Sequence, residues 1–262
     1  MKGSFIFSGT GNAEGIPVPF CSCPVCSVPS GKERLRSSGI LTVNDKVFLM
    51  DIGPDIRRQL LTYRIDHIDT AFLTHVHYDH VGGLDDLRAY NLVKLLPVKL
   101  ILSNFSYQKL MLTKPYLFLK NEGDSFSAMF DLNILDDVLI GDGNAEGVPF
   151  RYVTYRQGPF QVNGFRFGDF AYIVDMQQYN PIIKEALKGI RTLVLTVSAK
   201  ERDPLSMHPS FEEACEFAED INIERLVLTH IGHHTNIEER IRSSGNSDVT
   251  VAYDGMVVEI EF

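Results

Sequence analysis

Long apolar runs are missing from this sequence of 262 residues. No stretch approaches the roughly 20 consecutive apolar residues that a helix needs to span a bilayer. Residues 1–7 are too short in their apolar part for a secretory signal peptide, and they read as a strand. We therefore expect a cytoplasmic protein without a membrane partner.

Positive charge is also scarce. Lysine and arginine total 25 against 34 aspartates and glutamates, which gives a formal net charge of −9. Proteins that bind extended nucleic acid usually show a basic face, so this balance argues against nucleic acid as a partner. Low-complexity linkers and long repeats are missing too, and the length fits either one large α/β domain or two small ones.

Cysteines are few, but three of the four lie close together. Cys21, Cys23 and Cys26 fall within six positions. In a reducing compartment such a cluster is more typical of a metal site than of a disulfide framework. The alternative is three reduced, unliganded cysteines in a proline-rich loop. Cys215 lies on the expected buried face of a helix, so we interpret it as a core residue.

Short apolar runs alternate with helical patterns along the chain. The first half is rich in strands, α/β units follow, and the order then recurs, which is typical of two packed sheets with helices outside. The expected strands are residues 40–43, 46–50, 70–74, 98–102, 132–140, 150–155, 170–174, 192–197 and 225–229, with further hairpins at 160–167 (turning at Asn163-Gly164) and 249–260 (turning at Asp254-Gly255). The expected helices are residues 55–64, 84–96, 107–113, 209–220 and 237–243, and a loop rich in aromatic residues and leucine occupies the rest of 103–130.

Three histidines and one aspartate follow the strand at 70–74. His75 and His77 are two residues apart, so in an extended chain they point to the same side. The chain then turns, which lets Asp79 and His80 face a second metal. Imidazole and carboxylate ligands suit Zn²⁺, Mn²⁺ or iron, and a metal pair can activate water and stabilise both the attacking and the leaving oxygen. Such density within six residues disfavours the alternative of a chance cluster.

This run resembles the His-x-His-x-Asp-His motif of the metallo-β-lactamase superfamily. Three more segments resemble that family in the same order: the glycine-rich loop at 9–15, the strand-end motif at 51–55 and the strand that ends at Asp175. A fourth, Leu228-Thr-His230, resembles its last metal histidine. The resemblance implies a single domain over residues 1–262 with the α/β, four-layer αββα sandwich of two mixed β-sheets flanked by helices. It also implies that metal one is bound by His75 and His77, metal two by Asp79, His80 and His230, and that Asp175 bridges them.

The cysteine spacing narrows the resemblance. The pattern Cys-x-Cys-x-x-Cys at residues 21–26, with His230-x-x-His233, is similar to the phosphoribosyl cyclic phosphodiesterases of the carbon–phosphorus lyase pathway and their relatives. In that family these positions hold a structural zinc, and a closed Cys₃His tetrahedron is chemically sound. His234 is an adjacent competitor for the fourth position. The implied zinc ligands are Cys21, Cys23, Cys26 and His233.

The same resemblance assigns catalytic work to His208 and Asp79. An imidazole can protonate a leaving alkoxide near neutral pH. We predict a hydrolase in which metal-bound hydroxide attacks a small phosphodiester, such as a cyclic ribose or nucleotide phosphate. The expected cofactors are the structural Zn²⁺ and one or two Mn²⁺ or Zn²⁺ in the active site, and the family implies a homodimer. The alternative for His208 is a residue that merely precedes a helix.

Asp51 is expected to orient a ligand histidine through the free ring nitrogen of that histidine. Its alternative is a turn-forming aspartate before Gly53-Pro54.

One position departs from the family pattern. The family usually has another metal-one histidine shortly before a hairpin, but this chain has no histidine between His80 and His208. Gln157 is the nearest aligned residue, and an amide oxygen is a weaker ligand for Zn²⁺ than imidazole. Site one should therefore bind less tightly, complete its shell with water, or stay empty. Arg156 could instead pair with a substrate phosphate.

Three rival functions stay open. A ribonuclease Z-like tRNA 3′ endonuclease shares the histidine–aspartate motif, but the acidic balance and the cysteines weigh against it. A β-lactamase or thioesterase shares the fold, which alone excludes neither. A non-catalytic metal-binding relative is favoured by the glutamine at position 157.

Overall fold

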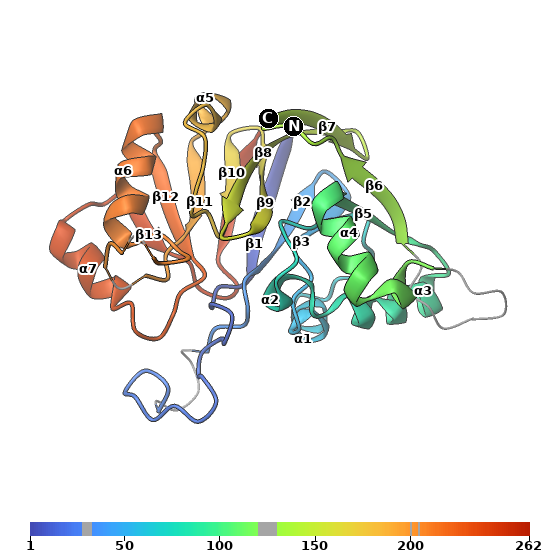
Figure 1. The fold of residues 1–262 in the computed structure, drawn as a ribbon, viewed down its shortest axis with the longest axis horizontal. Coiled ribbons are helices and arrows are strands. Elements are labelled where there is room, and N and C mark those ends of the chain that lie inside the picture. Colours follow the sequence, from blue (N-terminus) through green and yellow to red (C-terminus); the bar gives the residue numbers. More distant parts are fainter. Residues whose placement is uncertain (28–32, 120–129, 200, 204) are drawn as a thin grey trace.

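The computed structural model describes residues 1–27, 33–119, 130–199, 201–203 and 205–262, and it contains two seven-stranded sheets (Figure 1). The first sheet runs in the order β14 (Val257–Glu261), β1 (Lys2–Gly9), β2 (Ser38–Val43), β3 (Lys46–Met50), β4 (Thr70–Phe72), β5 (Val98–Ser103), β6 (Phe130–Leu135). The second runs β13 (Val249–Val251), β12 (Arg225–Thr229), β11 (Thr192–Thr196), β10 (Phe170–Ile173), β9 (Phe160–Phe167), β8 (Val148–Gln157), β7 (Ile140–Ala145). Each sheet is mixed, with parallel pairs at β3–β6 and at β10–β13.

Helices cover the outer face of each sheet (Figure 1). The first sheet carries α1 (Ile56–Thr62), α2 (Tyr78–Val81), α3 (Arg88–Lys94) and α4 (Asn104–Thr113), with 3-10 turns η1 (Leu84–Leu87) and η2 (Pro115–Leu117). The second carries α5 (Ile183–Leu187), α6 (Phe211–Ile221) and α7 (Ile237–Ser244). In the described ranges, no helix is long and apolar enough to cross a membrane.

Three apolar clusters separate these layers. One lies between the sheets and includes Phe5, Phe72 and Phe165; the other two lie between each sheet and its helices. Alternation along the strands produces this arrangement, because Leu41 of β2 faces the central cluster while Ile40 faces the helices. The expected four-layer αββα sandwich is therefore confirmed.

Three expected elements are wrong, and two of them failed because a local pattern does not say which sheet a strand joins. The single strand at 132–140 is two strands, since the chain leaves the first sheet at Leu135 and enters the second at Ile140. The hairpin at 249–260 is instead a crossover, in which β13 pairs with β12 and β14 pairs with β1.

The hairpin at 160–167 is one uninterrupted strand, β9. Asn163 pairs with Thr154 of β8 and Gly164 pairs with Val153, so the Asn-Gly pair stays extended. The chain turns at Gly158 and Gly168, whose φ values of 52° and 56° suit glycine. The helix expected at 107–113 is confirmed as α4, whereas residues 120–129 of the following loop lie outside the described residues.

Phe72 tests the central cluster. Its ring is fully buried and packs edge-on against Phe150, Phe165 and Phe167 at 5.1, 5.1 and 5.3 Å between ring centroids. We expect Phe72→Ala to lower the free energy of unfolding by about 3–5 kcal/mol in urea titrations followed by circular dichroism. Leu112→Ala, at a position 78% exposed on α4, is the control. Equal losses in the two variants would contradict this account of the core.

Candidate metal centre

The candidate site lies where strands of both sheets end. Asp51 directly follows β3, and His75 comes shortly after β4 in the same sheet. From the second sheet, Asp175 follows β10 and His230 directly follows β12. Ligand sites of α/β sheets form at the carboxyl ends of strands, so this topology brings residues that are distant in sequence to one place.

Three of these residues have left-handed backbones. The φ values are 63° for Asp51, 53° for Asp175 and 59° for His230. Such a conformation is uncommon outside glycine, although Asp and His adopt it more often than most residues, and it costs on the order of 1–3 kcal/mol each. At each of these positions the strand has ended, and the side chain contacts the other histidines and aspartates of the site.

The first group of donor atoms comes from Asp79, His80, Asp175 and His230, all buried. His80 Nε2 lies 3.1 Å from Asp79 Oδ2 and 3.0 Å from Asp175 Oδ2. His230 Nε2 lies 3.1 Å from Asp79 Oδ2 and 3.5 Å from Asp175 Oδ1. The structure thus brings together all four residues expected around metal two.

The second group comes from His75, His77 and Asp175. His75 Nε2 lies 3.0 Å from His77 Nδ1 and 3.3 Å from Asp175 Oδ2. The Asp175 carboxylate therefore belongs to both groups, as a bridging ligand would.

The donor geometry fits divalent ions. Two nitrogen ligands of a tetrahedral zinc, each about 2.0–2.1 Å from the ion, stand about 3.3–3.4 Å apart. His80 Nε2 is close to two carboxylates, yet it has no properly oriented hydrogen bond to any described residue. A buried nitrogen without a hydrogen bond beside two carboxylates is what an ion held there would explain.

The protonation states of His75, His77 and Asp79 fit as well. Burial and the neighbouring His80 lower the pKa of His75, and burial with His75 lowers the pKa of His77 to about 4. Both imidazoles are therefore neutral near pH 7, the state that binds metals. Burial alone would raise the pKa of Asp79, but His80 and His230 hold it well below its usual range, so the carboxylate stays charged.

Asp51 fixes which nitrogens face the centre. His80 Nδ1 donates to Asp51 Oδ2 at 2.7 Å, leaving Nε2 free. The Thr74 hydroxyl donates to Asp51 at 3.0 Å and accepts from His75 Nδ1 at 2.9 Å, which leaves His75 Nε2 free too. Asp51 therefore lies where it was expected. It binds His80 directly, and it reaches His75 through the Thr74 hydroxyl.

Two glycines allow this close packing. A Cβ on Gly53 would lie 2.2 Å from the carbonyl oxygen of Asp79, and one on Gly83 would lie 2.1 Å from that of Gly53. Larger residues there would push the loop after β3 away from α2, and with it Asp51 from His80.

His208 lies beside the cluster but belongs to neither donor group. Its Nδ1 is 3.3 Å from Asp175 Oδ1, and its side chain is 23% exposed. The cap of α6 is Ser210, not His208, so capping does not explain this histidine.

Sequence reasoning missed the residues that hold these side chains. Thr196 accepts from the Asp175 backbone N–H at 2.8 Å and donates to the Asp175 carboxylate at 3.2 Å. Gln177 donates to the Ser206 carbonyl at 2.8 Å, and Ser206 in turn donates to the carbonyl of His208 at 2.7 Å. The only signal was that Thr196 is a polar residue at the end of an apolar strand, and that Gln177 and Ser206 stand two residues from Asp175 and His208.

The structure also shows the surroundings of Gln157, the last residue of β8, where the chain departs from the family pattern. Gln157 is 2% exposed, and its Nε2 lies 3.3 Å from both the Met207 carbonyl oxygen and His208 Nδ1. Arg156 points to the opposite face of the strand, is exposed, and donates to the Pro159 carbonyl. The suggestion that Arg156 meets a substrate phosphate is therefore not supported.

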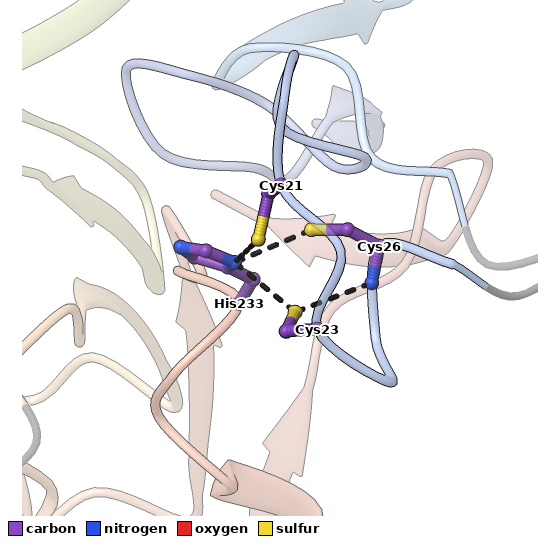
Figure 2. A group of neighbouring side chains, drawn as sticks. All are labelled: Cys21, Cys23, Cys26 and His233. Carbon is purple, nitrogen blue, oxygen red and sulfur yellow. Dashed lines mark hydrogen bonds between the residues drawn. The ribbon is translucent and has the colours of Figure 1, made fainter.

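A separate cluster joins the N-terminal loop to the segment after β12 (Figure 2). His233 Nδ1 lies 3.4 Å from the sulfurs of Cys21 and Cys23 and 3.2 Å from that of Cys26. A tetrahedral zinc with three sulfurs and one nitrogen places sulfur and nitrogen about 3.5–3.6 Å apart. His234 is exposed and only packs on the His233 ring, so the geometry selects His233 as the fourth member.

The thiols differ in chemistry. The backbone N–H of Cys26 donates to Cys23 Sγ and lowers the pKa of Cys23 to about 6, with further lowering by His233, although burial opposes the shift. Burial instead raises the pKa of Cys215 to about 11. Cys215 is half-buried against the outer apolar cluster, as expected for a packing residue.

The Cys21–Cys23–Cys26–His233 cluster lies three residues from His230. The intervening Ile231 also pairs with the glycine-rich loop, since its N–H donates to Thr10 and its carbonyl accepts from Asn12. The cluster and this pairing thus brace one side of the candidate centre.

We expect Cys23→Ser to lower zinc content by one ion per chain and to weaken metal binding at His230. A loss of about 2 kcal/mol would lower the melting temperature of a chain this size by roughly 4–8 °C. Elemental analysis and calorimetry measure both, with Cys215→Ser as the matched control. Unchanged melting and metal content in Cys23→Ser would refute the bracing role.

Asp51→Asn removes the charge that holds His80 and Thr74. Loss of such an orienting partner typically costs 10–100-fold in metal affinity, and we expect a decrease of about that size. Competition with a chromophoric chelator measures it, and Asp66→Asn, at a side chain 83% exposed, is the control. Equal affinities in the two variants would show that Asp51 is only a turn residue.

Comparison with known proteins agrees with this geometry. A curated octanoyltransferase of Porphyromonas gingivalis (strain ATCC BAA-308 / W83) is 28% identical over 262 residues. That match covers 98% of this chain but 51% of the relative, so the chain spans about half the length of that protein.

Two crystal structures share the whole fold. A diphosphatase from the PhnP family is 27% identical with a TM-score of 0.88, covering 99% of this chain and 98% of that one. This likeness confirms a resemblance of this chain to the PhnP family. The short form of human tRNase Z is 17% identical with a TM-score of 0.69, covering 99% of this chain and 100% of that one, and it shows the fold alone.

A family model described as a β-lactamase superfamily domain matches residues 46–231. This segment holds every histidine and aspartate of the two donor groups. The chain therefore belongs to the metallo-β-lactamase superfamily and carries the site of a metal-dependent hydrolase.

Proposed function

We propose that the protein hydrolyses a small phosphodiester, such as a cyclic ribose or nucleotide phosphate. The observation that carries this proposal is His208. It is an imidazole next to the donor groups that is not needed as a ligand and that remains accessible from outside. Phosphodiester hydrolysis with a poor leaving group needs such a proton donor.

The ligand sets follow from the two donor groups. His75, His77 and Asp175 would hold one Mn²⁺ or Zn²⁺, and Asp79, His80, His230 and Asp175 would hold another. Such ions, when bound, activate water and neutralise phosphate oxygens. Cys21, Cys23, Cys26 and His233 would hold a structural Zn²⁺.

His208 would deliver the proton to the leaving oxygen. Its Nδ1 lies 3.3 Å from Asp175 Oδ1, so Nε2, which is 3.5 Å from the Gln157 amide nitrogen, is the nitrogen that would face a substrate. Gln177 and Ser206 fix the loop that carries the ring through the Ser206 and His208 carbonyls. Asp79 would contribute by holding its ion and keeping negative charge within the buried site.

A cavity beside His208 favours a small substrate. Its volume is about 310 Å³, and His208, Gln178, Tyr179 and Arg202 line part of it. This is near the lower end of the range for small-molecule pockets, roughly 300–1,000 Å³. Glu213, Glu216 and Asp220 also line the cavity, and such acidic walls suit a hydroxylated leaving group better than polyanionic RNA.

A diphosphate is the second candidate substrate. The relative that is 27% identical is named a diphosphatase. Hydrolysis of a P–O–P linkage also begins with attack on phosphorus, so the same residues serve either substrate. The relative named octanoyltransferase makes an octanoyl ester the appropriate acyl control.

The decisive assay compares leaving groups. We expect protein loaded with Mn²⁺ or Zn²⁺ to hydrolyse bis(p-nitrophenyl) phosphate and a nucleoside 2′,3′-cyclic phosphate, but not p-nitrophenyl octanoate. His208→Asn should lower kcat on the cyclic phosphate by about 10²–10⁴-fold. Its effect on the aryl diester should be much smaller, because p-nitrophenolate leaves without protonation.

His67→Asn, on a half-buried histidine that pairs with Asp66 and belongs to neither donor group, is the matched control. Absence of turnover on every phosphodiester and diphosphate by metal-loaded protein would sink the proposal. Binding and cleavage of pre-tRNA would favour a ribonuclease Z-like endonuclease function instead.

A further inference from the structure

We infer that Gln157 completes metal site one through its amide oxygen, which makes that site an exchangeable partner to a tighter site two. This inference rests on the proposed metal-dependent function and specifies the metal site that departs from the family. It concerns the ligand set of this chain, in which no imidazole takes the place next to His75 and His77.

The donor count leaves one place to fill. Site two has four protein donors, whereas site one has His75, His77 and the shared Asp175. Structural and catalytic zinc sites commonly have four ligands, of which at least three come from protein. An additional neutral oxygen would complete site one without adding charge.

The Gln157 amide is held in a single orientation. Its nitrogen lies 3.3 Å from the carbonyl oxygen of Met207, which can only accept. The nitrogen must therefore be on that side, and the oxygen on the other. Oε1 is buried and has no hydrogen-bond partner among the described residues. A buried acceptor without a partner is costly, and a bound ion would remove that cost.

The strand register places the Gln157 side chain on the side of site one. Gln157 pairs with Phe160 across the β8–β9 turn. The Phe160 ring packs edge-on against the His77 ring, with 4.5 Å between ring centroids. Successive side chains of a strand alternate between faces, so Arg156 and its partner Gln161 lie on the opposite face.

The same amide also contacts His208. Its nitrogen lies 3.3 Å from His208 Nδ1 and 3.5 Å from Nε2, at the edge of the ring between them. An ion at site one that binds Oε1 would therefore also fix the amide group against which the proposed proton donor rests. Occupancy of site one and the position of His208 are then linked through one side chain.

Manganese binding tests the inference without using activity. Protein that keeps its structural zinc is stripped of exchangeable metal and titrated with Mn²⁺ by calorimetry and electron paramagnetic resonance. We expect one tight and one weaker ion in the wild type. Gln157→Leu should raise the dissociation constant of the weaker ion by about tenfold to a hundredfold and leave that of the tight ion unchanged.

Two more variants separate ligation from support of the fold. Gln157→Glu keeps an oxygen but loses the donor to Met207, so a ligand role predicts a tighter second ion and a purely supporting role predicts behaviour like Gln157→Leu. Gln157→His should tighten the second ion by at least about tenfold, since imidazole is the stronger ligand. Gln161→Leu, on the opposite face of the same hairpin, is the matched control.

The outcomes also separate this inference from the proposed function. Two Mn²⁺ sites that respond to Gln157 in protein that turns over no phosphodiester would support the ligand role and reject the function. Turnover in protein whose second ion is insensitive to all three Gln157 variants would overturn the ligand role and leave the function standing.

Discussion

The hydrogen bonds of the buried Asp51 carboxylate orient histidines of both donor groups, and the geometry of the candidate centre depends on them. On one side Asp51 accepts from His80, and on the other it accepts from Thr74, which accepts from His75. These bonds occupy the outer nitrogen of a histidine from each donor group and leave the inner nitrogens free. Gly53 and Gly83 let the loop after β3 lie close to α2, and this close approach brings the Asp51 carboxylate to His80.

The second constraint is that buried charge needs compensation. Asp51, Asp79 and Asp175 are at most 5% exposed, and isolated carboxylates in such surroundings would be very costly. Burial opposes protonation of His80, yet these three carboxylates raise its pKa well above the ordinary value. The buried carboxylates therefore attract positive charge to the site, whether it is carried by a proton or by a divalent cation. The two donor groups are nevertheless supported unequally, since the cysteine–histidine cluster and the glycine-rich loop contact the segment that carries His230.

Local sequence patterns predicted the candidate metal ligands but not which strands pair with one another. The run from His75 to His80 and the cysteine triplet could be recognised because ligand type and spacing are local properties. The choice between His233 and His234 depends on how the chain turns after β12, which spacing does not encode. The strand at 132–140 and the hairpin at 249–260 failed because either sheet would accept the same apolar residues. The suggestion that Arg156 could serve the site overlooked strand alternation, which puts Gln157 and Arg156 on opposite faces.

The central claim is that histidines and aspartates from both sheets form a metal centre around Asp175, separate from a structural zinc. Anomalous diffraction from crystals grown with Zn²⁺ and Mn²⁺, recorded at the absorption edges of both metals, tests it most directly. The account predicts a zinc peak among the three clustered sulfurs and His233, and metal peaks on both sides of the Asp175 carboxylate. A zinc peak at the sulfurs with no anomalous signal around Asp175 would contradict it.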